Sequence, residues 1–214
     1  MNTQASSGGG DEQDQPRPLF SLRFKQAEAL ADATSVLLDF RLAATALDRL
    51  IKLLAEKSDD DLVKGSLWTT AVVSYSRCFI GGRSPPLGES VFEGFHESAL
   101  GFHRHLITMR DKHVAHSVNP FEQVAVGAVV GNDEAGIHRV IGTGVLAVKH
   151  VMFDDQGVSD FRHLVGGLES KIAATCKALE AAVLAEAQTR PVEEIVAMPR
   201  LGITAPGPSD ATRR

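Results

Sequence analysis

Residues 103–121 read HRHLITMRDKHVAHSVNPF and mark the point where the helical pattern of the first half of the chain gives way to a β-like pattern. Apolar residues and histidines recur in this stretch at spacings of three and four, on one face of a predicted helix: Leu106, Met109, His113 and His116. The dipeptide Asn119-Pro120 disfavours helical geometry and predicts that the helix ends just before it. His116 is therefore expected in the last turn, where the helix dipole favours a protonated imidazole.

Before this stretch the sequence predicts three helical regions. The first spans residues 19–56, and its apolar residues recur at helical spacing: Leu37, Phe40, Ala44, Leu47, Ile51 and Leu54. Residues 20–31 form either an earlier helix or the start of the same one, and Thr34 or Ser35 is a candidate cap for a later start.

The second helical region spans residues 59–80 and ends at Gly81-Gly82. Trp68 and Tyr75 lie seven residues apart on one face of it, a pattern that favours core packing over a base-stacking site. The third region spans residues 89–117. Glycine is a poor helix former, so a break near Gly94 is expected.

After residue 121 the period of the pattern changes. Residues 123–131 and 137–152 are rich in valine, and the turn cluster Asn132-Asp133-Glu134-Ala135-Gly136 separates them. We expect a β-hairpin over about residues 123–152, bulged at Gly142 or Gly144. Two strands alone are marginally stable, so the hairpin is expected to lie on the helices, on a third strand or on a second subunit.

The last helix is predicted over residues 161–187, after a turn at 154–157 and a cap at Ser159 or Asp160. Residues 1–18 and 188–214 are rich in polar residues, Gly and Pro and are expected to be mostly disordered, with a short helical turn at 192–196. The sequence therefore predicts one mainly α domain over residues 19–187: a bundle of four to five helices with an inserted or appended hairpin.

Composition excludes some classes of protein. The chain has 214 residues and a formal net charge of −5, which argues against coating nucleic acid through bulk positive charge but permits a local basic site. Its two cysteines, Cys78 and Cys176, are expected to be reduced thiols rather than a disulfide. No apolar run approaches the ~20 residues of a membrane span, and residues 1–18 contain no apolar signal core. A cytoplasmic protein is expected.

Arg110 and His116 combine a guanidinium that is always charged with an imidazole that titrates near neutral pH. Such a pair suits phosphoryl chemistry on RNA. The imidazole moves a proton at the 2′-hydroxyl or the leaving oxygen, and the guanidinium stabilises charge that builds on phosphorus. This scheme requires no metal and no cofactor. The spacing alone also fits a simpler interpretation, in which Arg110 pairs with Asp111 or Glu97 and His116 interacts with its own helix end.

The segment Arg110-Asp111-Lys112-His113-Val114-Ala115-His116-Ser117 resembles the signature of the HEPN superfamily. That signature is an Arg, usually followed by a polar residue, and then a His after four to six intervening residues near the end of a late bundle helix. Here five residues intervene and Asp111 is the polar follower. The resemblance implies that Arg110 stabilises the transition state, that His116 is the acid or base, and that Asp111 orients the pair.

The same resemblance implies a helical bundle that dimerises so that both Arg/His pairs face one cleft. Many such proteins are metal-independent endoribonucleases of toxin–antitoxin, abortive-infection or CRISPR-associated systems. The implied partners are single-stranded or loop RNA, a second copy of the chain, and an antitoxin or other partner protein. Inactive members of the superfamily supply the alternative, a module that binds a nucleotide or a partner protein. The hairpin at 123–152 departs from the plain bundle.

The histidines of the 103–121 stretch permit two further interpretations. His113 lies between Arg110 and His116 on the helix surface, so it either shares the catalytic cleft or packs against the core. A metal site is the weaker idea. His113 and His116 are three residues apart and can chelate, but no carboxylate or cysteine is spaced to complete a ligand set.

Overall fold

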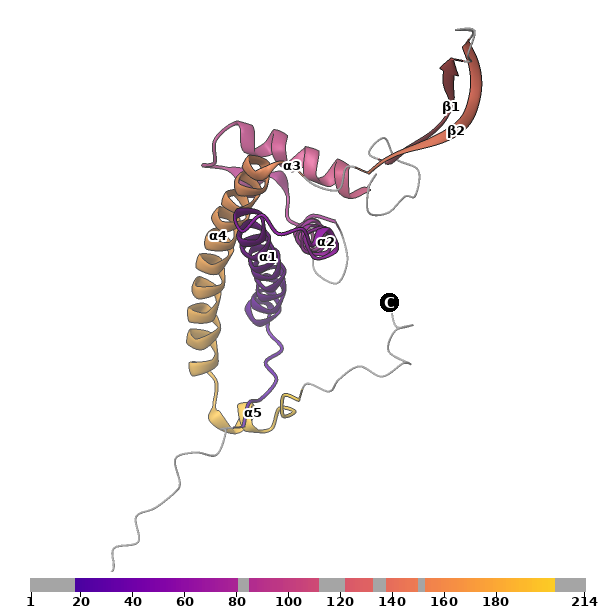
Figure 1. Ribbon diagram of the computed structural model, residues 1–214. Helices are drawn as coiled ribbons and strands as arrows, with labels where there is room; N and C mark the ends of the chain where they lie inside the picture. Colours follow the sequence, from indigo (N-terminus) through magenta and orange to yellow (C-terminus); the bar gives the residue numbers. More distant parts are fainter. Residues whose placement is uncertain (1–17, 81–84, 112–121, 133–137, 150–152, 203–214) are drawn as a thin grey trace, which may run out of the picture.

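The computed structural model describes residues 18–80, 85–111, 122–132, 138–149 and 153–202. In these ranges the chain forms five α-helices, one short 3-10 helix and one antiparallel hairpin, which is inserted between α3 and α4 (Figure 1). The helices are α1 (Lys25–Ala55), α2 (Asp61–Arg77), η1 (Glu89–Phe92), α3 (Ser98–Met109), α4 (Asp155–Gln188) and α5 (Val192–Val196). The strands are β1 (Glu122–Asn132) and β2 (His138–Lys149). The prediction of a mainly helical fold with an inserted hairpin is confirmed.

Helix α1 is a single helix of 31 residues, so residues 25–31 extend it and neither Thr34 nor Ser35 caps a later start. It lies alongside α4, and α2 packs against its other side (Figure 1). The residues of α1 that face its neighbours recur at three and four and are buried: Val36, Leu37, Phe40, Ala43, Ala44, Leu47 and Leu50. The periodic apolar stripe therefore predicts both the helix and the face that it buries.

Aromatic side chains fill the centre of the core between α1, α2 and α4. Trp68 and Tyr75 are 1% and 0% exposed, and the ring of Phe161 from α4 lies 5.7 Å from Trp68 and 5.2 Å from Tyr75, both edge to face. Burying each of these rings contributes about 1.5–3 kcal/mol to stability. The core interpretation of Trp68 and Tyr75 is confirmed, because neither ring is accessible for base stacking.

The third predicted helical region is broken, as expected, at Gly94. Its φ of 86° is a left-handed backbone conformation that glycine adopts without steric cost. The 3-10 turn η1 therefore ends before Gly94, and α3 begins after it at Ser98.

Helix α4 begins earlier than the sequence predicts. The side chain of Asp154 accepts a hydrogen bond from the backbone N–H of Gly157 (2.9 Å) and caps the helix. Val158 and Phe161 are fully buried, so the turn that contains residues 155–160 is held in the core. The prediction of a turn at 154–157 with a cap at Ser159 or Asp160 is wrong, because the burial of Val158 extends the helix into that segment.

The hairpin pairs β1 and β2 without a third strand among the described residues. Its register shifts between Val129, which pairs with Gly142, and Val130, which pairs with Val140. Ile141 is therefore the extra, bulged residue, next to one of the two glycines predicted for the bulge. A Cβ on Gly131 would lie 2.6 Å from Cδ1 of Ile141, so the glycine leaves the space that the bulged side chain occupies.

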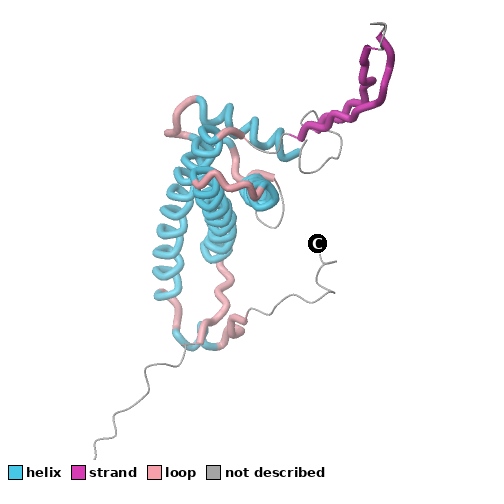
Figure 2. Tube along the Cα trace, viewed as in Figure 1, coloured by secondary structure: helices cyan, strands magenta, loops and turns pink. Residues whose placement is uncertain are grey.

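The hairpin projects away from the helices, as the view of the backbone by element type makes clear (Figures 1 and 2). Residues 124–130 and 138–147 are all exposed, although most of them are apolar. The expectation that the hairpin lies on the helices or on a third strand is therefore wrong for the described part of the chain. Neither of its faces is covered there.

The two ends of the described chain meet at the far end of the bundle. The backbone N–H of Ser21 donates to the carbonyl of Pro199, and that of Leu201 donates to the carbonyl of Leu19, both at 2.8 Å. Helix α5 occupies the predicted helical turn at 192–196. Cys78 and Cys176 are both buried and unpaired. No helix in the described ranges is long and apolar enough to cross a bilayer.

Candidate functional site

The candidate site begins where α3 leaves the core. Leu106 and Met109 are 0% and 5% exposed, so they fix the rotation of α3 and place the next residue, Arg110, at the edge of the packed region. Arg110 is the C-cap, and its backbone N–H is directed at the carbonyls of Leu106 and Ile107. Leu106 and Met109, the first two residues of the predicted helical stripe, therefore lie in the core, as their spacing predicts.

Arg110 and Asp111 form an ion pair at this helix end. Nη1 of Arg110 donates to Oδ1 of Asp111 at 2.8 Å, and the two side chains are 34% and 53% exposed. The guanidinium is therefore held at the surface by its neighbour in sequence and is not buried in the core. Such a half-exposed pair adds little stability, at most about 1 kcal/mol. Its effect is to restrict where the guanidinium points.

The structure brings together two of the four predicted site residues. His113 and His116 lie in residues 112–121, outside the described residues, so their positions relative to Arg110 stay predictions. In the described ranges no group of three or more His, Cys, Asp or Glu side chains is arranged to hold a metal ion.

His103, two helical turns before Arg110, is a core residue. It is 7% exposed, and its ring lies 4.3 Å from Phe79 and 4.7 Å from Phe92. Nδ1 of His103 and the hydroxyl of Tyr75 share a hydrogen bond of 2.9 Å, which satisfies both buried polar groups. This histidine therefore helps to pack α3 against α2 and is not available to a ligand.

The titration of these core groups follows from their burial. Desolvation lowers the pKa of His103, against a smaller opposing effect of Glu89. Burial likewise raises the pKa of the Tyr75 hydroxyl far above its ordinary value, and it raises the pKa of the Cys78 thiol to about 12, with Asp39 adding to the shift. All three groups are thus neutral in the folded protein near neutral pH, and Cys78 is an unreactive thiol.

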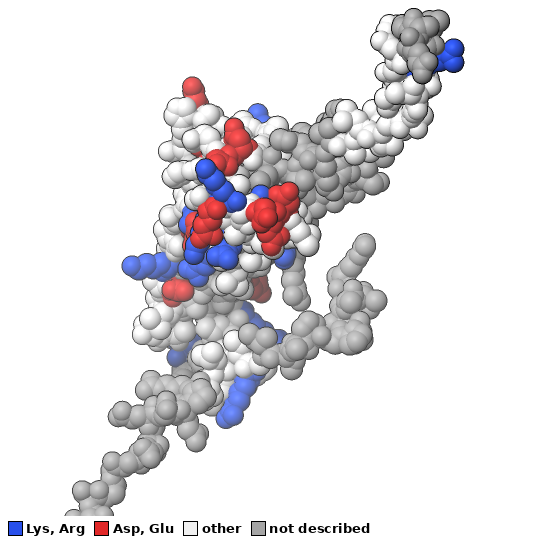
Figure 3. Space-filling view, viewed as in Figure 1, with Lys and Arg blue, Asp and Glu red and all other residues white. Residues whose placement is uncertain are grey.

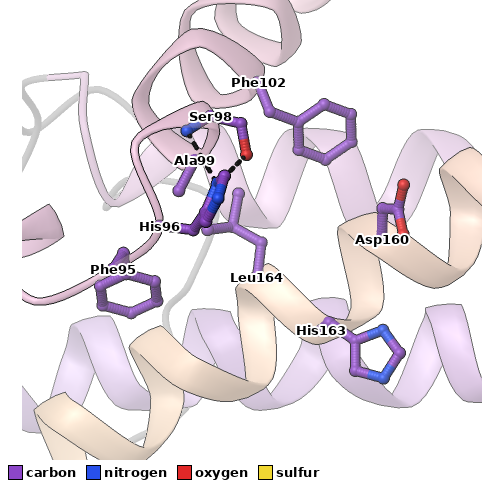
Figure 4. A pocket seen from close by; sticks show the side chains of 8 residues that line it. All are labelled: Phe95, His96, Ser98, Ala99, Phe102, Asp160, His163 and Leu164. Carbon is purple, nitrogen blue, oxygen red and sulfur yellow. Dashed lines mark hydrogen bonds between the residues drawn. The ribbon is translucent and has the colours of Figure 1, made fainter.

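A pocket that the sequence did not predict lies between the start of α3 and the start of α4 (Figure 4). It has a volume of about 560 Å³, and its lining residues are Phe95, His96, Ser98, Ala99, Phe102, Asp160, His163 and Leu164. The two groups of lining residues are about 60 positions apart in the sequence. No local pattern joins them, because only the packing of α3 on α4 brings them together.

The polar side chains His96 and Asp160 of this pocket form hydrogen bonds with residues close to them in the sequence. Nδ1 of His96 lies 2.8 Å from Oγ of Ser98 and accepts a hydrogen bond from the backbone N–H of the same serine at 3.3 Å. The imidazole therefore closes the turn that starts α3. Asp160 accepts a hydrogen bond from Nε2 of Gln156 at 2.8 Å, and in Figure 4 its carboxylate and the ring of His163 lie apart from the His96–Ser98 pair. Among the residues that the structure describes, no third group is hydrogen-bonded to His96 to orient it as a catalytic triad would require.

Basic side chains on the helices near the candidate site are engaged in ion pairs. Arg104 donates two hydrogen bonds to the carboxylate of Glu89, at 2.9 and 3.0 Å, and Arg77 lies 3.5 Å from Asp39. Positive and negative charges alternate over the helices in Figure 3, while the hairpin is almost uncharged. This face of the molecule therefore presents no broad basic surface of the kind that holds nucleic acid without specificity.

Comparison with models of protein families, with curated proteins and with solved structures found no match to this chain.

Proposed function

We propose that this chain is a metal-independent endoribonuclease of HEPN type, with Arg110 and His116 as its catalytic residues. Arg110 stabilises the transition state, and His116 transfers the proton. Asp111 orients the pair, and His113 borders the same cleft. The observation that carries the proposal is the placement of Arg110: the packed residues Leu106 and Met109 bring it to the exposed end of α3, where Asp111 holds it.

The proposed reaction is an internal transfer within RNA. His116 removes the proton of a 2′-hydroxyl, the 2′-oxygen attacks phosphorus, and the bond from phosphorus to the 5′-oxygen breaks. A protonated imidazole returns the proton to the departing 5′-oxygen, and Arg110 stabilises the added charge on the phosphoryl oxygens. The products are a 2′,3′-cyclic phosphate and a 5′-hydroxyl, so the reaction consumes no water and no cofactor.

A homodimer completes this site. A second copy supplies a second Arg110 and His116, so that one imidazole acts as base while the other acts as acid. A cytoplasmic role in a toxin–antitoxin or phage-defence system follows from the same resemblance, with an antitoxin or similar protein as a further partner.

A second candidate function is a binding module without catalytic activity, which holds a nucleotide or a partner protein. The specific observation in its favour is the Arg110–Asp111 ion pair of 2.8 Å, because an engaged guanidinium is less available to a phosphoryl group. The exposed hairpin supplies an interface for a protein partner.

Cleavage of an end-labelled RNA pool in the presence of EDTA tests the proposal. The wild type is compared with Arg110→Ala and His116→Ala, and we expect each substitution to reduce cleavage by at least about 100-fold. Arg104→Ala is the matched control: it removes a guanidinium of the same helix, exposed and paired with Glu89, six residues away. Circular dichroism verifies that each variant is folded.

The outcomes separate the two functions. Cleavage that persists in Arg104→Ala and is lost in the other two variants supports the ribonuclease. If no protein cleaves RNA, the binding module is the better reading, and a search for a bound nucleotide or protein follows. Cleavage that survives both site substitutions would show that the motif is not the site.

A further inference from the structure

The two faces of the hairpin differ in side chains. Residues that pair across an antiparallel ladder point to the same face, so the register assigns each side chain to one of two faces. We call the middle part of one of them the valine face; it consists of Val124, Val126, Ala128, Val130, Val140, Thr143, Val145 and Ala147, and the pairs Glu122–Lys149 and Asn132–His138 continue the same register at its two ends. The opposite face, called the glycine face, contains Ala125, Gly127, Val129, Gly142, Gly144 and Leu146.

The valine face is apolar, uncharged and open. Its five valines are 58–74% exposed, and none of its eight residues carries a charge. In Figure 3 the hairpin is correspondingly white along most of its length. A β-branched surface on an isolated pair of strands is marginally stable in water, and an exposed apolar face of this kind indicates an interaction site.

The glycine face offers much less side chain for packing. Three of its six residues have no side chain, so the apolar groups of Leu146 and Val129 stand apart along it. Leu146 is nevertheless as exposed as its neighbour Val145, at 67% and 69%. The two residues are adjacent in β2 and point to opposite faces, which makes them a matched pair for experiment.

We propose that the valine face binds the valine face of a second copy of this chain, so that two hairpins pack face to face as a two-layer, four-stranded unit. A two-fold interface requires a patch that is complementary to itself. An uncharged row of valine and alanine meets its own copy without charge repulsion. The eight residues of the valine face likewise give a basic or acidic partner, RNA included, no charge to pair with; the charged pair Glu122–Lys149 lies at the end of the hairpin beyond them.

The size of the face sets the strength of the interaction. Strands of 11 and 12 residues rise about 3.4 Å per residue and lie about 4.8 Å apart, so one face presents about 400 Å². Two copies bury about 800 Å², the size of a weak, transient interface. We therefore expect a dimer that dissociates in the micromolar range. The projection of the hairpin away from the helices in Figure 1 leaves room for the second copy.

Sedimentation velocity of the full chain, without RNA, over about 1–200 µM tests the proposal. The wild type is expected to change from monomer to dimer over this range. Val145→Lys is expected to raise the dissociation constant about 100-fold, because each dimer carries the substitution twice and each copy weakens it about tenfold. Leu146→Lys, with the same charge on the opposite face, is expected to dimerise like the wild type.

A charge-reversal mixture distinguishes a lost contact from a damaged fold. Val145→Lys and Val145→Glu are each expected to be monomeric, whereas an equimolar mixture of the two is expected to form a heterodimer. Recovery of the dimer in the mixture supports the interface, and a mixture that stays monomeric overturns it.

Three further results would overturn the proposal: a wild type that is monomeric at 200 µM, equal weakening by Val145→Lys and Leu146→Lys, or a dimer that Val145→Lys leaves intact. A dimer that survives Val145→Lys would be formed by another surface, as the ribonuclease proposal allows. Since RNA cleavage is the readout of the ribonuclease proposal, a wild type that cleaves RNA and whose dimer survives Val145→Lys would overturn only the interface proposed here.

Discussion

Acidification is expected to destabilise this protein through His103. The imidazole is 7% exposed among aromatic rings, and its burial lowers its pKa below the ordinary value of 6.5. Between that lowered pKa and about 6.5 the unfolded chain binds a proton that the folded protein does not bind. Stability therefore falls as the pH falls through this window, by at most about 1.4 kcal/mol per pH unit for a single group.

Urea unfolding at pH 7.5, 6.5 and 5.5 measures this effect, with the fluorescence of Trp68 as the signal. Trp68 is the only tryptophan in the chain and is 1% exposed, so its emission reports on the core. We expect the wild type to lose unfolding free energy between pH 7.5 and pH 5.5, by at most about 1.4 kcal/mol from this group. Glu89, whose pKa the hydrogen bond from Arg104 lowers, loses its contribution at more acidic pH, outside this range.

His103→Gln removes the titrating group but keeps a polar partner for the Tyr75 hydroxyl. We expect this variant to be less stable than the wild type at pH 7.5, since the ring contacts are lost, and to show little change in stability from pH 7.5 to pH 5.5. His105→Gln is the control, because His105 is on the same helix and exposed. A His103→Gln variant that retains the full pH dependence of the wild type would refute the reasoning.

Two stability predictions concern local backbone and can be measured by the same urea unfolding. Gly94→Ala is expected to destabilise the protein by about 1–2 kcal/mol, because φ is 86° at this residue. Gly101→Ala, inside α3, is expected to stabilise it by about 0.5–1 kcal/mol. Neither new Cβ would lie within 4 Å of another atom, so equal effects of the two substitutions would contradict the backbone argument. Asp154→Ala is expected to lose about 1 kcal/mol through the missing cap of α4, and a change below about 0.3 kcal/mol would mean that the cap contributes nothing.

The sequence predicts the helices best where one face is both apolar and buried. The apolar stripe of α1 predicts where the helix runs, because Phe40, Leu47 and Leu50 recur at helical spacing and all three are buried. The start of α4 could not be predicted in the same way. Asp154 and Gly157 are typical of a turn, and only the burial of Val158 by the rest of the fold makes the segment helical.

The candidate site was predictable only in part for a similar reason. The helix end that carries Arg110 and Asp111 follows from local spacing and from the packing of Met109. The pocket lined by His96 and His163 is formed by two segments that are distant in sequence, so no local sequence motif predicts it. The exposure of the hairpin was not predictable from its pattern either, because valine-rich strands are usually buried.

The pairing of α1 with α4 has a consequence for synthesis on the ribosome. Arg162 of α4 donates two hydrogen bonds to Asp48 of α1, 114 residues earlier in the chain. At a translation rate of about 5–20 residues per second, roughly 6–23 s pass between the synthesis of Asp48 and that of Arg162, and during this time the apolar face of α1 is not covered by α4. Both hairpin strands leave the ribosome during that interval. A nascent chain thus exposes its first long helix and its valine-rich strands at the same time, and exposed apolar surface of this kind favours aggregation before the fold is complete.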